Sequence, residues 1–96
     1  MKPQQNDIVE DVAKWLNQCG FAEDLSALTA GLHDIHAAME KIYSKLLPSL
    51  LQLNASQKDE ALDVVIALWL EMEHIRRHAV STVDVLTEVR DFLDES

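Results

Sequence analysis

Four histidines are the residues of this chain whose type and spacing could support chemistry. They form two pairs, each completed by a carboxylate at spacings of three and four residues: His33, His36 and Glu40, and Glu71, His74 and His78. Imidazole and carboxylate groups that project from facing helices build the metal sites of helical bundles. His33, His36, His74 and His78 are therefore the candidate ligands of a metal-binding bundle.

The rotational phase of the two sets argues against a shared site. The first set follows the apolar seam of its helix by one residue, and the second set precedes its seam by one residue. One residue turns a helix by about 100°, so the sets of two antiparallel helices point to opposite flanks. We therefore expect no metal and no cofactor, and a His/Glu metal-binding bundle stays an alternative function.

Enzymatic activity is not expected either. The serines are scattered without a matching base, and paired carboxylates are unremarkable in a chain with 17 Asp and Glu. Gly20 and Gly31 are the only glycines, which excludes a glycine-rich phosphate loop. We assign no catalytic residue and no cofactor-binding residue.

The 96 residues carry 17 Asp and Glu against 8 Lys and Arg, a net charge of −9. So little positive charge argues against direct nucleic-acid binding, although an acidic DNA mimic stays a second alternative. The longest apolar run, residues 64–70, is too short for a bilayer, which needs about 20 residues. The polar N-terminus lacks a signal-peptide pattern, and Cys19 is the only cysteine. We therefore expect a cytoplasmic protein without membrane contact.

The apolar spacing predicts an all-α fold in one domain, residues 1–96. We expect a short N-terminal helix at about 7–18, capped by Asn6 or Asp7, then a long antiparallel helical hairpin. Its helices cover about 22–53, with a kink at Pro48, and about 57–94, capped by Ser56. The apolar positions of the first helix form one stripe: Ile8, Val12, Trp15 and Cys19.

Each long helix carries a coiled-coil-like seam in which spacings of three and four alternate. The seam of the second helix is Leu25, Leu28, Leu32, Ile35, Met39, Ile42 and Leu46. The seam of the third helix is Ala61, Val65, Leu68, Met72, Ile75, Ala79, Thr82, Leu86, Val89 and Leu93. Small residues also gather on the second helix, at Ala27, Ala30, Gly31, Ala37 and Ala38. They indicate either close approach of another helix, such as the first helix or a partner, or an unselected surface.

A second apolar stripe lies beside the seam of the third helix, and a helix that is apolar all round is normally buried all round. Its members are Leu62, Ile66, Trp69 and Leu70. We expect this stripe to form a two-fold interface that pairs two hairpins into a four-helix bundle. The alternative is that the first helix folds back and covers the stripe within one chain.

Further apolar side chains predict a surface for another cytoplasmic protein, because such anchors often dominate binding energy. They are Trp15, Leu16, Tyr43, Leu47, Leu50 and Leu51. In size, acidity and paired long helices the chain resembles the small helical anti-activators that sequester bacterial transcription regulators. That resemblance implies an inhibitor, and an adaptor is the other reading. The acidic residues 84–96 indicate either a surface for a basic partner or a frayed, solvated end.

Overall fold

The computed structural model describes residues 7–95, and all regular secondary structure in that part of the chain is helical. The elements are α1 (Ile8–Gln18), α2 (Ser26–Lys41), a π-helical turn (Ile42–Leu46), α3 (Leu47–Leu51) and α4 (Lys58–Glu95). The prediction of an all-helical fold with a long C-terminal helix is confirmed. Within residues 7–95, no helix is both long and apolar enough to cross a membrane.

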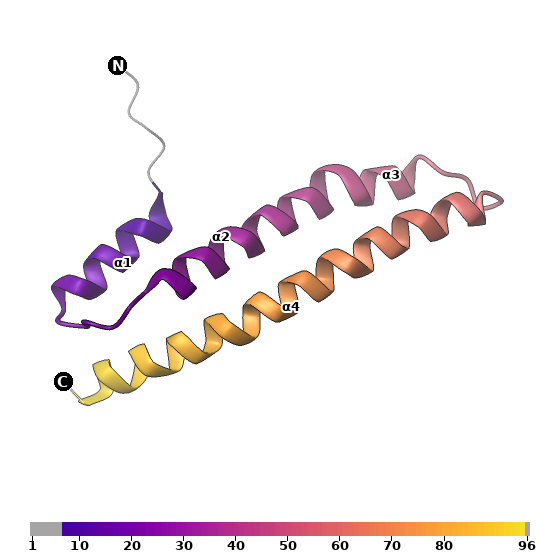
Figure 1. The fold of residues 1–96 in the computed structure, drawn as a ribbon. Coiled ribbons are helices and arrows are strands. Elements are labelled where there is room, and N and C mark those ends of the chain that lie inside the picture. The colour runs from indigo at the N-terminus through magenta and orange to yellow at the C-terminus, as the bar shows by residue number, and fades with distance from the viewer. Residues whose placement is uncertain (1–6, 96) are drawn as a thin grey trace, which may run out of the picture.

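α2 and α4 lie side by side and run in opposite directions (Figure 1). Two ion pairs join them: Lys41 Nζ lies 2.9 Å from a Glu71 carboxylate oxygen, and His78 Nε2 lies 3.1 Å from Asp34 Oδ2. α1 lies at the end of the molecule opposite the connection between α3 and α4. It sits beside the start of α2 and near the C-terminal part of α4 (Figure 1).

α1 begins as its sequence predicts. The Asp7 side chain accepts hydrogen bonds from the backbone N–H groups of Val9 and Glu10, so Asp7 is the N-cap. Asn6, the other predicted cap, lies outside the described residues. After the helix, Gly20 takes a φ of 102°, a left-handed conformation that suits glycine.

The second helix begins at Ser26, four residues later than the predicted start at residue 22. Phe21 donates its N–H to the Leu16 carbonyl, and Asp24 accepts the N–H of Ser26 at 2.9 Å. Both bonds fix residues 21–25 as a connection between α1 and α2. This connection places Phe21 and Leu25 in the core, which explains why these residues are not helical.

The distortion expected at Pro48 occurs one turn earlier, as the π-helical turn Ile42–Leu46. Pro48 has no N–H to donate to the Ser44 carbonyl, and its ring crowds that carbonyl in a regular helix. The wider turn relieves the crowding: Leu47 donates to the Ile42 carbonyl, five residues back. The helical path then ends at Leu51, two residues before the predicted end.

α4 begins at Lys58, one residue after the predicted start, and Ser56 is not its capping residue. The Ser56 hydroxyl instead donates to Asn54 Oδ1 at 2.7 Å, within the connection that precedes the helix. The backbone N–H of Asn54 donates in turn to Gln57 Oε1 at 3.0 Å. The connection is therefore stabilised by its own polar side chains.

The face of α4 that packs against α2 is not the face marked by the predicted seam. Its contacts with α2 include Glu71, His78 and Thr82, which belong to a series of buried or half-buried positions. That series is Val64, Leu68, Glu71, Ile75, His78, Thr82, Val85, Val89 and Phe92. Every second member of this series also belongs to the predicted seam. Each of the other members lies one residue before the corresponding member of the predicted seam. α4 is therefore turned by about 50° from the predicted orientation.

The small residues of α2 allow α4 to approach closely. Gly31 and, two turns later on the same face, Ala38 are buried, whereas Ala27, Ala30 and Ala37 are exposed. A Cβ atom at Gly31 would collide with the Thr82 hydroxyl of α4. The close approach of another helix is thus confirmed at Gly31, and that helix is α4 and not α1 or a partner.

The main core lies where α1, the start of α2 and the last part of α4 meet. It contains Ala13, Leu16, Phe21, Leu25, Leu28 and Val89. The Phe21 and Phe92 rings close it in an edge-to-face contact, with centroids 5.4 Å apart. Along the rest of its length α4 packs on one other helical path only, which leaves much of its apolar surface uncovered.

Candidate functional site

One candidate site is an apolar surface near the start of α4. Leu62 is 56% exposed and Trp69 is 60% exposed, and Ile66 and Leu70 are also about half exposed. α1 does not cover these side chains, because it packs at the opposite end of the molecule (Figure 1). The alternative in which the first helix folds back over this stripe is therefore not what the structure shows.

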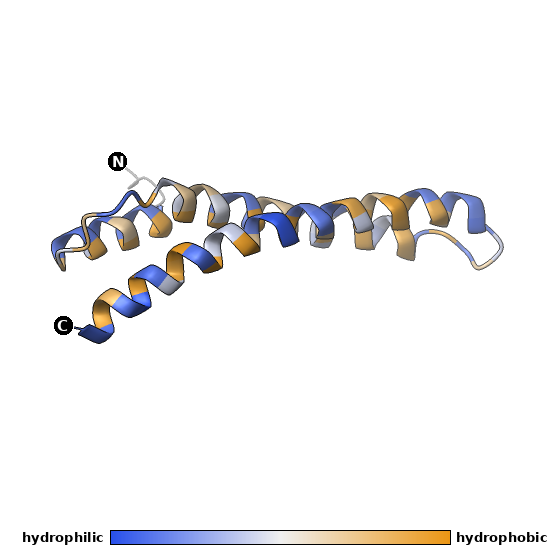
Figure 2. Ribbon diagram, turned by 60° about the horizontal axis from the view of Figure 1, so that its bottom comes forward, coloured by the Kyte–Doolittle hydropathy of each residue, from blue (hydrophilic) through white to orange (hydrophobic). Residues whose placement is uncertain are grey.

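The rotation of α4 enlarges this surface beyond the predicted stripe. Val65 and Met72, which the sequence assigns to the seam with α2, are exposed instead. We call the combined surface the α4 patch, and its members are Leu62, Val65, Ile66, Trp69, Leu70 and Met72. Figure 2 shows hydrophobic segments recurring along the whole of α4. Beyond the patch, Val83, Leu86 and Leu93 are exposed as well.

The apolar stripe of α1 also faces outward. α1 packs on the core through Ala13 and Leu16, so its other side exposes Ile8, Val12 and Trp15. Leu16 is only 4% exposed, because it points into the core beside Phe21, and it offers no surface to a partner. We call the exposed residues Ile8, Val12 and Trp15 the α1 stripe. Periodicity shows that such a stripe exists but not whether it faces in or out.

The other predicted partner-binding residues lie around the π-helical turn and α3. Tyr43 and Leu51 are exposed, and Leu47 and Leu50 are half-buried. These side chains lie at the end of the molecule opposite α1. The predicted partner-binding residues therefore do not form one continuous surface (Figure 1).

His33 links α2 to α1. Its Nε2 lies 2.9 Å from Asp7 Oδ2, the carboxylate that also caps α1. The hydrogen bond with Asp7 raises the pKa of His33, and the bond with His33 lowers the pKa of Asp7. The Asp7–His33 pair thus joins the first turn of α1 to α2.

The two histidine pairs do not meet in the described part of the chain. His33 lies near Asp7 and Glu10, whereas His74 and His78 lie near Asp34. The expected separation of the pairs holds, but the phase argument behind it is wrong for the second set. Glu71 and His78 point toward α2 and not to a flank, because α4 is turned from its predicted orientation. The acid that His78 meets, Asp34, was not among the predicted ligands.

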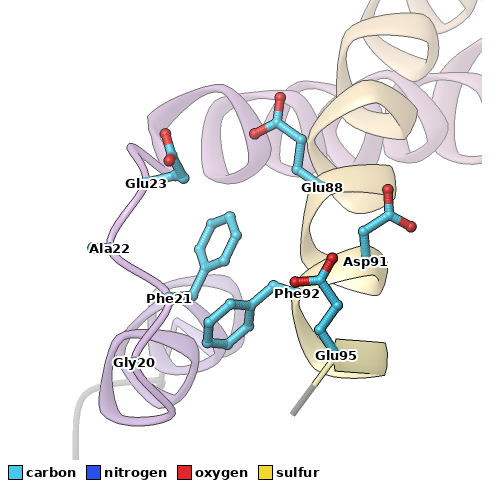
Figure 3. A pocket seen from close by; sticks show the side chains of 8 residues that line it. All are labelled: Gly20, Phe21, Ala22, Glu23, Glu88, Asp91, Phe92 and Glu95. Atoms are coloured by element: carbon cyan, nitrogen blue, oxygen red, sulfur yellow. The ribbon is translucent and has the colours of Figure 1, made fainter.

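A shallow acidic hollow lies between the connection after α1 and the end of α4. Figure 3 shows the Phe21 and Phe92 rings together at its base, with carboxylates around them. The carboxylates belong to Glu23, Glu88, Asp91 and Glu95. α4 is helical up to Glu95, so Glu88, Asp91 and Glu95 all line this hollow from the last turns of α4.

Comparison with known protein families, with curated proteins and with solved structures gives no match for this chain.

Proposed function

We propose that this protein is a non-enzymatic interaction module, an acidic helical homodimer that binds another protein and inhibits or scaffolds it. The observation that carries the proposal is the exposed α4 patch. Its six side chains are apolar and face away from the rest of the chain. Fully burying a side chain of this kind stabilises an assembly by about 1.5–3 kcal/mol.

The shape of the chain supports pairing. Its accessible surface is 7270 Å², whereas a compact monomer of 10.8 kDa exposes about 5,500 Å². Its radius of gyration is 18.2 Å, against about 12 Å for a compact domain of this length. A standard interface removes about 800 Å² from each partner, so one two-fold contact hides a large part of the excess.

Charge favours a second copy at this place. Each chain carries a net charge of −9, so two copies repel each other wherever their acidic surfaces face. The α4 patch contains no charged residue, which makes it a surface on which two copies can meet at low electrostatic cost. Pairing α4 with α4 gives four long helices, the arrangement of a four-helix bundle.

The α1 stripe is the surface that we assign to the other protein. It lies at the end of the molecule away from the α4 patch, so a homodimer leaves it free. Trp15 is its largest side chain, and tryptophan is a frequent anchor of protein interfaces. An amphipathic helix of this kind fits an apolar groove on a partner.

The test uses two matched variants as baits for partner capture, each confirmed as folded by circular dichroism. Trp15→Gln and Trp69→Gln remove equally large, similarly exposed side chains from the two surfaces. The proposal expects capture to be lost with Trp15→Gln in α1 and to persist in high salt. Capture that is unchanged by Trp15→Gln but abolished by salt would favour the acidic DNA mimic, with the acidic end of α4 as its surface.

A further inference from the structure

We propose that Asp34, His74 and His78 form a binding site for a zinc ion that joins α2 to α4. The inference is independent of the dimer, because none of these residues belongs to the α4 patch. The site contains a pair of imidazoles. His74 and His78 are four residues apart on α4, and their ring centroids lie 4.5 Å apart with an interplanar angle of 76°. Histidines one turn apart on a helix are the spacing with which two imidazoles bind one zinc ion.

The third ligand comes from the facing helix. Asp34 Oδ2 lies 3.1 Å from His78 Nε2, and one ligand atom from each of the three residues lies within 4.8 Å of the others. Bonds from zinc to nitrogen or oxygen are about 2.0–2.2 Å, so neighbouring ligand atoms of a tetrahedral site lie roughly 3.3 Å apart. The Asp34–His78 distance already fits this value. Rotation of the exposed His74 side chain brings in the remaining nitrogen.

The backbone is suited to hold such a site. Gly31 and Thr82, one turn from Asp34 and His78 respectively, lie against each other between α2 and α4. Thr82 is tied to the same turn of α4, because its hydroxyl donates to the His78 carbonyl at 2.7 Å. Asp34 and His78 therefore project from two helices whose separation is fixed by packing, and only side-chain rotation is needed for binding.

The donor set selects the class of metal. Two imidazole nitrogens and one carboxylate oxygen suit zinc and neighbouring transition metals, whereas calcium and magnesium prefer oxygen ligands alone. Three protein ligands leave the fourth position to water. On binding, the hydrated zinc ion loses all of its waters except the one in the fourth position. The His78 nitrogen that faces Asp34 then carries no proton, which has moved to solvent or to the other ring nitrogen.

The second cluster of similar residues is a weaker candidate and serves as the control. Asp7, Glu10 and His33 also lie within 4.8 Å of one another. Asp7 is already used, because it caps α1 and pairs with His33. One imidazole with two exposed carboxylates is a poorer zinc site than two imidazoles with one carboxylate.

The experiment is calorimetric titration of the full chain, without a histidine tag and stripped with a chelator, with Zn²⁺ alone. We expect one zinc per chain, with an affinity that falls as the solution is made more acidic, because protons compete with zinc for the imidazole nitrogens. His74→Gln removes an exposed ligand and leaves the helix contacts intact, so it should weaken binding at least about tenfold. Asp34→Asn should do the same.

Two further measurements keep the outcome decisive. His33→Gln and His36→Gln alter histidines outside the site, and both should bind zinc as the unchanged chain does. Because the site joins two helices, Zn²⁺ should raise the urea midpoint of the unchanged chain but not that of His74→Gln. Absence of zinc binding, equal affinity after His74→Gln, or loss of binding only after His33→Gln would each overturn the proposal.

Discussion

Gly31 of α2 lies directly against the side-chain hydroxyl of Thr82 on α4. That hydroxyl is held in place by its hydrogen bond to the His78 carbonyl, and Thr82 is buried. The absence of a side chain at residue 31 therefore sets how closely the two long helices approach.

The first prediction concerns this contact. Gly31→Ala places a Cβ atom on the Thr82 hydroxyl, and overpacking of this kind costs about 1–3 kcal/mol. Alanine also removes the cost of a glycine within a helix, about 1 kcal/mol, so the net loss is smaller. We expect Gly31→Ala to lower the free energy of unfolding measured in urea at fixed protein concentration.

The same contact provides its own controls. In a Thr82→Ala background the obstacle is gone, so Gly31→Ala should now stabilise the protein. In a Thr82→Val background a methyl group replaces the hydroxyl and Gly31→Ala should remain destabilising. An effect of Gly31→Ala that is the same in all three backgrounds would show that residues 31 and 82 do not determine the helix separation.

The second prediction concerns the pH dependence of α1. The pKa of His33 is raised above its ordinary value of 6.5 by Asp7. The charged His33 therefore stabilises the docking of α1 fully below pH 6.5, and this stabilisation is lost as the pH rises through the raised pKa. The pKa of Asp7 is lowered below its ordinary value of 3.8. The charged Asp7 therefore stabilises the docking of α1 fully above pH 3.8, and this stabilisation is lost as the pH falls through the lowered pKa. We expect amide-exchange protection of α1 to be greater at about pH 5.5 than at about pH 8.5.

Variants separate this pair from the other histidines. His33→Gln should remove the difference in protection between the two pH values, because the charged partner of Asp7 is lost. His36→Gln changes a histidine three residues further along α2 and should leave the difference intact. Protection of α1 that does not depend on pH in the unchanged chain would rule out this role for the Asp7–His33 pair.

The third prediction concerns the π-helical turn. Pro48→Ala supplies the missing N–H and removes the ring that crowds the Ser44 carbonyl, so residues 42–46 can return to regular α-helix. Proline in a helix interior costs about 3 kcal/mol relative to alanine, and the gain is smaller here because Pro48 lies in the first turn of α3. We expect a higher urea midpoint, with Ser49→Ala as the control that keeps the proline. A lower midpoint for Pro48→Ala would mean that the turn has another cause.

The sequence predicts which segments are helical more reliably than which way they face. Apolar residues at spacings of three and four indicate α1 and α4, and Asp7 marks the start of α1. The orientation of α4 is not readable in this way, because apolar residues surround its first turns and two seams fit equally well. The choice between them shows in the pairs Lys41–Glu71 and Asp34–His78, whose members lie far apart in the sequence. The rotation of α4 also brings His78 to Asp34, an acid that the predicted seam did not place beside the histidines.

The most direct test of the central claim is the mass of the protein in solution, measured by sedimentation equilibrium at micromolar concentrations. The unchanged chain should have twice the mass of one 10.8 kDa chain. Trp69→Gln in the α4 patch should shift it toward a single chain, whereas Trp15→Gln, which replaces a similarly exposed tryptophan on α1, should leave the dimer intact. A single-chain mass for the unchanged protein, or a dimer unaffected by Trp69→Gln, would contradict the account.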